Sequence, residues 1–84
     1  MNRATDEWHY IYGRPTLFVG GVAVGDCYPS KGTDDGAAIW RIRLWRENRL
    51  QGGSERLILA AAGEETARMV LLEMYQGARR ESGE

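Results

Sequence analysis

The apolar residues of this chain follow the period of a β-strand before Gly63, most clearly over residues 37–45, and the period of a helix after it. Alternation places successive side chains on opposite faces of a strand, whereas helical spacing gathers them on one face of a helix. A single switch between the two patterns predicts a sheet followed by a helix. We therefore expect an α+β domain, in which a three- or four-stranded antiparallel β-sheet meander carries one C-terminal α-helix packed on one face.

The strand pattern is clearest over residues 37–45, AAIWRIRLW. One face of this segment carries Ala38, Trp40, Ile42 and Leu44, and the other carries Ile39, Arg41, Arg43 and Trp45. The first face is apolar throughout, so we expect it in the core. Another strand-like segment, residues 54–60, follows a glycine turn, which predicts antiparallel pairing between the two.

Residues 17–28, LFVGGVAVGDCY, contain a Gly-Gly pair between apolar residues. Glycine tolerates the positive φ angles of a two-residue hairpin turn, so we expect strands over 16–19 and 22–28 with a turn at Gly20 and Gly21. A single strand bulged at the two glycines is the alternative. Loop-forming residues at 29–36 then separate this region from the next strand.

The helical pattern starts at Gly63, with Glu64 and Glu65 in a first turn that favours acids. We expect Gly77 to end the helix, with Arg79 and Arg80 beyond it. The expected core consists of Trp40, Ile42, Leu44, Val70, Leu71 and Met74. Residues 1–84 would form one small domain, with a leader or edge element at 1–13, the meander at 14–61 and the helix at 63–78.

Size and charge exclude several classes of protein. An 84-residue chain with a single cysteine buries a modest core and holds no internal disulfide, which favours a stabilising partner or a homodimer. The net charge of −1 gives no overall attraction to nucleic acid or anionic lipid. The first 15 residues lack an apolar signal core, and no apolar run has the length of a membrane span, so we expect a cytoplasmic protein without membrane contact.

The chain also lacks a convincing catalytic or cofactor motif. Lys31 precedes Gly32 instead of following the glycine loop, so the phosphate-binding pattern fails. One histidine and one cysteine cannot supply the four ligands of a structural zinc site. Nothing brings His9 near Cys27 or a serine to form a nucleophile and base pair. We therefore expect neither an enzyme nor a bound cofactor or metal.

Two sets of residues are candidates for binding a partner. Arg41, Arg43 and Trp45 alternate on the non-core face of the central strand, and Arg46 follows them. Arginine and aromatic side chains together bind proteins or stack on nucleic acid, but such arginines also pair with nearby acids on an ordinary solvated face. Met69, Leu72 and Tyr75 form a second apolar line on the helix, which is either a partner or dimer surface or a wider core face.

Residues 16–76, which contain GGVAVGDCYP, WRIRLW and GGSERLILAAAGEETARMVLLEMY, resemble a class of short phage and prophage proteins. In that class a glycine hairpin precedes a tryptophan-bearing strand, a glycine turn and a helix. Small phage proteins of this kind are often stoichiometric inhibitors, and anti-CRISPR proteins share this size and composition. The resemblance implies a non-enzymatic protein that binds a host protein complex, such as a CRISPR effector, in the host cytoplasm. A nucleic-acid-binding module that uses the Arg and Trp face is the alternative.

Overall fold

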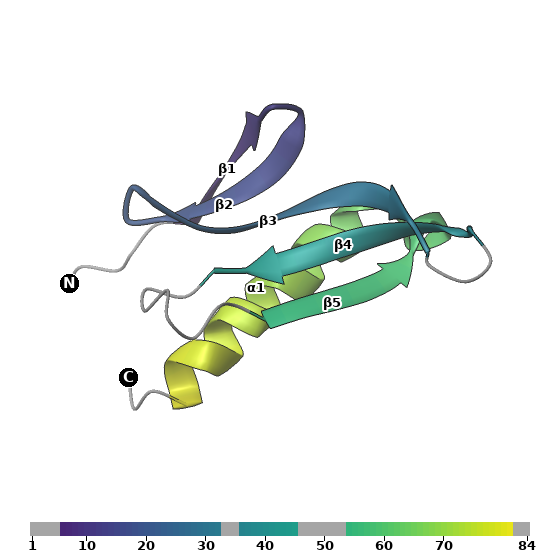
Figure 1. The fold of residues 1–84 in the computed structure, drawn as a ribbon. Helices are drawn as coiled ribbons and strands as arrows, with labels where there is room; N and C mark the ends of the chain where they lie inside the picture. Colours follow the sequence, from purple (N-terminus) through teal and green to yellow (C-terminus); the bar gives the residue numbers. More distant parts are fainter. Residues whose placement is uncertain (1–5, 33–35, 46–53, 82–84) are drawn as a thin grey trace.

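The computed structural model describes residues 6–32, 36–45 and 54–81, which form an antiparallel sheet with a helix on one side (Figure 1). The elements are β1 (Asp6–Ile11), β2 (Arg14–Val19), β3 (Val22–Lys31), β4 (Ala38–Leu44), β5 (Ser54–Leu59), the 3-10 turn η2 (Ala60–Ala62) and α1 (Gly63–Glu81). The strands lie in chain order, and each pairs antiparallel with the next. The expected α+β meander with a C-terminal helix is confirmed.

The sheet has five strands, so the expected number of three or four is wrong. The additional strand is β1, which the sequence placed in a leader or edge element. It turns into β2 through Tyr12 and Gly13, both at positive φ, and pairs with β2 along its whole length. Only Trp8 of β1 is even half-buried. An edge strand with so little burial has no need of an alternating apolar pattern, which is why the pattern did not reveal it.

The turn at Gly20 and Gly21 is confirmed. Both glycines have positive φ, and Val19 faces Val22 across the two-residue loop. The pairing of β2 with β3 shifts register between Leu17 and Phe18, which leaves Val24 without a partner on β2. A bulge is therefore present in this hairpin, but it lies at Val24 and not at the two glycines.

β3 also runs further than expected, through residues that the sequence assigned to a loop. Pro29 lies within it and faces Trp40 of β4. The pairing of β3 with β2 ends at Asp26, so this end of the strand is paired on one side only. A proline is tolerated in a strand at such an edge position.

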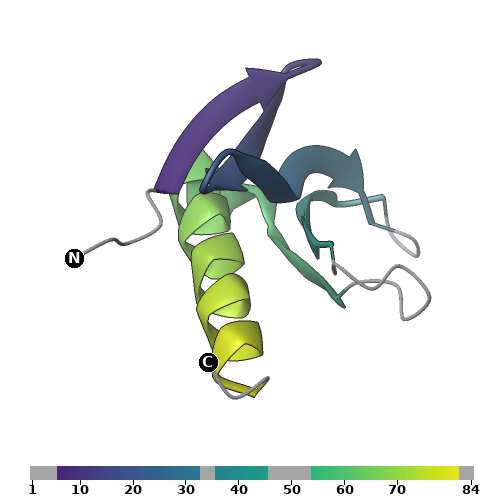
Figure 2. The same ribbon diagram turned by 90° about the vertical axis from the view of Figure 1, so that its left-hand side faces the viewer.

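The helix covers one face of the sheet, and none of the described elements covers the opposite face (Figure 2). Of the expected core, Ile42, Leu44 and Leu71 are buried, while Trp40, Val70 and Met74 are half-buried and pack against that cluster. The buried cluster is completed by Leu17, Val19, Cys27 and Ala67. The face of β4 that alternation assigned to the core therefore does meet α1.

The helix continues to Glu81, so its expected end at Gly77 is wrong. Gly77 is not among the glycines with positive φ, and it therefore does not form a left-handed cap. Ala78, one residue later, packs against the core cluster. Burial of this additional turn outweighs the weak helical propensity of one glycine.

A close approach between the layers occurs at Gly25 of β3. A Cβ atom added there would overlap the carbonyl oxygen of Arg43 and would lie 2.9 Å from Leu71 Cδ1. Both distances are shorter than van der Waals contact. The backbone of β3 thus meets α1 and β4 at a point that excludes any side chain.

We predict that Gly25→Ala lowers the free energy of unfolding by about 2 kcal/mol, because the methyl group must displace backbone as well as Leu71. Gly77→Ala is the matched control. A Cβ at Gly77 meets nothing within 4 Å, so this change should stabilise the helix by about 0.5 to 1 kcal/mol. Urea unfolding followed by circular dichroism measures both. Equal effects of the two substitutions would contradict the packing described.

Candidate functional site

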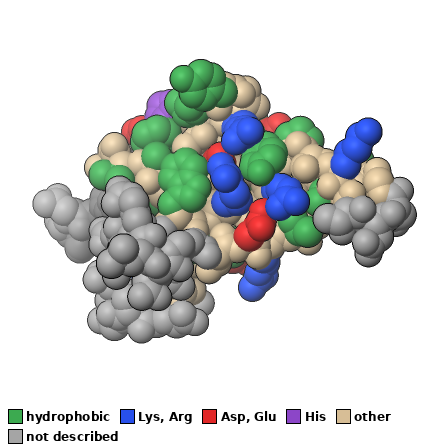
Figure 3. Space-filling view, viewed as in Figure 1, with side chains coloured by type: hydrophobic (Ala, Val, Ile, Leu, Met, Phe, Trp, Pro, Cys, Tyr) green, Lys and Arg blue, Asp and Glu red, His purple; other side chains and the backbone are tan. Residues whose placement is uncertain are grey.

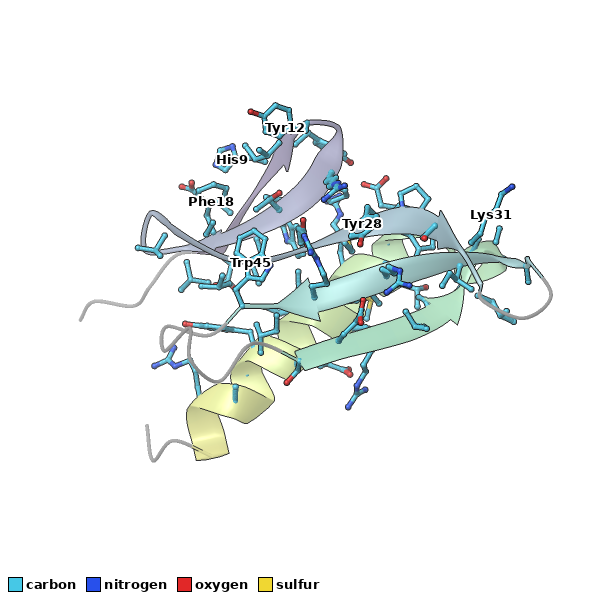
Figure 4. All side chains as sticks on the ribbon, viewed as in Figure 1. His9, Tyr12, Phe18, Tyr28, Lys31 and Trp45 are labelled. Atoms are coloured by element: carbon cyan, nitrogen blue, oxygen red, sulfur yellow. The ribbon has the colours of Figure 1, made fainter. Side chains whose placement is uncertain are left out.

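The face of the sheet turned away from α1, called the open face below, carries charged and apolar side chains together (Figure 3). Strand alternation assigns to it Glu7, His9, Ile11, Arg14, Thr16, Phe18, Asp26, Tyr28, Arg41, Arg43, Trp45, Glu55, Leu57 and Leu59. Tyr28 and Trp45 lie on this side of the sheet in Figure 4. All five strands thus contribute to one surface.

Asp26 lies at the centre of the open face and is only 4 % exposed. Arg43 donates two hydrogen bonds to its carboxylate, from Nε to Oδ1 and from Nη2 to Oδ2, each 3.1 Å long. This two-point geometry is a strong form of arginine–carboxylate pairing. The hydrogen bond to Asp26 is the main reason that the pKa of Arg43 is raised above its ordinary value.

A second arginine approaches the same carboxylate from β2. Arg14 Nη1 lies 3.8 Å from Asp26 Oδ2, and its guanidinium stacks over the Tyr28 ring at 4.1 Å. Arg43 also lies within 5.2 Å of the Tyr28 ring centre and 6.0 Å of the Trp45 ring centre. At such distances the positive guanidinium group is attracted to the face of the aromatic ring.

The β5 side of the open face is less charged. Arg41 Nη1 donates to Glu55 Oε2 over 2.7 Å, which neutralises that arginine. Beside this pair, Leu57 is 51 % exposed and faces Arg41 across the strands. Trp45, at the end of β4, is 40 % exposed. The surface therefore combines paired charges with accessible apolar side chains.

The structure brings together three of the four residues expected on this surface, Arg41, Arg43 and Trp45. Arg46 lies outside the described residues. Arg41 and Arg43 both pair with carboxylates, which agrees with the alternative interpretation of a solvated face with paired charges. Sequence reasoning missed Arg14, Asp26 and Tyr28, whose positions follow from the pairing of β3 with its neighbours. The alternation of Asp26 and Tyr28 with Gly25 and Cys27 was the available signal.

The three residues of the second candidate set, on the helix, differ in how deeply they are buried. Leu72 and Tyr75 are half-buried and pack against the core cluster, which agrees with the alternative of a wider core face. Met69 is 57 % exposed. The three residues therefore do not form a continuous exposed line, and only Met69 is fully available to a partner.

The residues with catalytic potential have structural contacts instead. Cys27 is fully buried, and burial raises the pKa of its thiol to about 11, which removes the reactive thiolate at neutral pH. The His9 ring lies edge-on to Phe18 at 5.0 Å and contacts Glu7. In the part of the chain that the structure describes, no group of three metal-binding side chains gathers. Within the same residues, no helix has the length and apolarity needed to cross a bilayer.

The chain matches no protein-family model, no curated protein and no solved structure.

We predict that Asp26→Asn lowers the free energy of unfolding by about 1 to 2 kcal/mol, because the neutral amide loses its charge-assisted bonds to Arg43. Glu55→Gln removes the corresponding charge from a more exposed pair and should cost about 0.5 kcal/mol or less. Chemical denaturation of both variants tests the difference. A larger loss from Glu55→Gln than from Asp26→Asn would contradict the central role of Asp26.

A pH prediction follows from Cys27. Its pKa is raised in the folded chain to about 11, from 9.0, so the neutral thiol stabilises the fold fully below pH 9, and this contribution is lost as the pH rises through 11. Between pH 8 and pH 10, the free energy of unfolding of the native chain should fall by about 1 kcal/mol more than that of Cys27→Ala. Denaturant unfolding at the two pH values measures this. A constant difference between the two chains would contradict a buried neutral thiol.

Proposed function

We propose that this protein is a small non-enzymatic inhibitor of the phage type, which binds stoichiometrically to a protein complex of the host cell. A CRISPR effector is the favoured target, and the host cytoplasm is the proposed place of action. The resemblance of residues 16–76 to short phage and prophage proteins supports the class. The open face is the proposed binding surface, with Arg41, Arg43 and Trp45 on it.

One observation supports a protein target over nucleic acid. The arginines of the open face are paired with carboxylates of the same chain, while Trp45 and Leu57 remain exposed beside them. Tyrosine, tryptophan and arginine are the residues that contribute most to protein–protein affinity. A phosphate backbone instead needs unpaired cations, and most of these cations are neutralised within the chain.

A nucleic-acid-binding function is the competing proposal, and Arg14 is the observation that favours it. Arg14 shares Asp26 with Arg43, so two guanidinium groups face one carboxylate. Tyr28 and Trp45 offer rings on which bases stack. Binding of this kind weakens by about 0.7 to 0.9 log units per log unit of salt for each phosphate neutralised, whereas apolar protein contacts do not.

The test uses nuclease-treated host lysate and a panel of purified CRISPR effector complexes. We expect a complex that survives nuclease, tolerates added salt and inhibits the effector at a one-to-one ratio. Trp45→Ala and Leu57→Ser should each weaken binding by about tenfold or more, since both side chains would be buried at the interface. Met69→Ser, an exposed apolar residue on the helix, is the matched control and should leave binding unchanged.

Two results would overturn the proposal. Recovery of nucleic acid alone, with binding that falls steeply with salt and is lost in Arg14→Ala, would establish the competing function. Binding to a protein target that is lost in Met69→Ser but kept in Trp45→Ala would place the interface on the helix side and not on the open face.

A further inference from the structure

A groove of about 460 Å³ lies between the edge strand β1 and the first half of α1, away from the open face. It is lined by Trp8, Glu64, Glu65, Arg68, Met69 and Leu72. Arg68 covers the Trp8 ring at 5.2 Å, and its Nε lies 3.6 Å from Glu64 Oε2. Tyr10 donates a hydrogen bond from its hydroxyl to Glu64, which joins β1 to the helix at one end of the groove.

The backbone of β1 has hydrogen-bonding groups directed along the outer edge of the sheet. Pro15 faces Tyr10 and has no N–H to donate, so this pair belongs to the non-hydrogen-bonded set of the ladder. Ile11 and Arg14 close a two-residue turn and therefore form a hydrogen-bonded pair. Because hydrogen-bonded and non-hydrogen-bonded pairs alternate along the ladder, the next pair, Tyr10 and Pro15, is again non-hydrogen-bonded. Trp8 and Tyr10 therefore direct their N–H and C=O groups outward, while their side chains face the helix.

The charge of the groove identifies the kind of chain that fits it. Glu64, Glu65 and Arg68 line the groove, and Arg68 pairs with Glu64. Asp6 adds a third carboxylate on the same side of β1. The carboxylate of Glu65 has no partner among the described residues. Trp8, Met69 and Leu72 supply apolar walls between these acids. An extended segment with basic side chains around an apolar one matches this surface in both charge and polarity.

We propose that β1 and α1 together form a docking site for an extended basic segment of a partner protein, which adds to β1 as an antiparallel sixth strand. Main-chain hydrogen bonds to Trp8 and Tyr10 supply affinity, and alternate side chains enter the groove and supply specificity. An apolar side chain lies between Trp8 and Met69, and lysine or arginine side chains two residues before and after it face Glu64 and Glu65. This site is separate from the open face and does not depend on the function proposed above.

The probe is the blocked peptide Lys-Thr-Leu-Thr-Lys-Thr, which has the six-residue length of β1. Its lysine and leucine side chains fall on one face of a strand. The chain has three tryptophans, so nuclear magnetic resonance of the indole N–H groups reports where the peptide binds. We expect the Trp8 signal to move and those of Trp40 and Trp45 to stay. The same peptide with glutamate in place of lysine should not bind.

Backbone and side-chain contributions are separated by matched changes. Methylating the amide nitrogens of the leucine and lysine residues should abolish binding, because these amides face β1, whereas methylating those of the threonines should leave it intact. On the protein, Glu65→Gln should weaken binding about two- to fivefold. Glu73→Gln, an exposed helix residue outside the groove, should leave it unchanged.

Several results would overturn this site. Movement of the Trp45 signal instead of Trp8 would place the peptide on the open face, and equal effects of the two methylation patterns would exclude strand addition. Equal binding of the lysine and glutamate peptides would exclude the charge match. A dimer in sedimentation, with Trp8 signals that change with protein concentration, would show that a second copy occupies the edge. Contacts from Trp8 to residues 1–5 that persist with the peptide present would show that the chain occupies its own groove.

Discussion

The contact between Leu71 and the bare backbone of Gly25 determines how the two layers of this protein meet. Because no side chain is possible at Gly25, α1 approaches β3 closely, and Leu71 reaches a fully buried position. A helix held over the middle of the sheet buries Ile42 and Leu44 of β4 beneath it. The outer strands receive less cover, which is why β1 and β5 retain exposed side chains and why a groove lies beside β1.

Asp26, the next residue along β3, organises the opposite face of the same sheet. Gly25 pairs with Leu44 and Asp26 with Arg43, so one step along two strands changes the environment from apolar core to charged surface. Arg43 and Arg14 both approach this buried carboxylate, and their guanidinium groups lie over the Tyr28 ring. A buried charge with several bonds of this kind restricts the side chains around it to few conformations. The centre of the open face is therefore organised by charge-paired side chains around Asp26.

The sequence predicted those parts of the fold that rest on local patterns. The change of hydrophobic period indicated a sheet followed by a helix, and the turn at Gly20 and Gly21 followed from the φ angles that a hairpin requires. The sequence left β1 open as a leader or an edge element, because the stability of this strand comes from pairing with β2 and not from burial of its own side chains. The helix passed Gly77 because Ala78 packs half-buried against the core cluster, and this contact outweighs the low helical propensity of one glycine.

Part of the candidate surface was predictable as well, because it follows from a local pattern in the sequence. Alternation within one strand was enough to place Arg41, Arg43 and Trp45 together. The pairing of Arg43 with Asp26 depends on the register between two strands, and the approach of Arg14 depends on a third. Such cross-strand distances are set by loop lengths and by the bulge at Val24, neither of which can be read from side-chain pattern alone.

β1 links the two proposed binding surfaces, because its side chains alternate between them. His9 lies against Phe18 on the open face, whereas Trp8 and Tyr10 point to the groove beside α1. A strand added at this edge would lie about 4.8 Å from β1, and every second side chain would extend the open face by one strand. The groove and the open face would still be two separate surfaces, on opposite sides of the sheet. A partner that supplies the strand would therefore bind at the groove and leave the open face accessible to a second protein, since successive side chains of β1 point to opposite faces of the sheet.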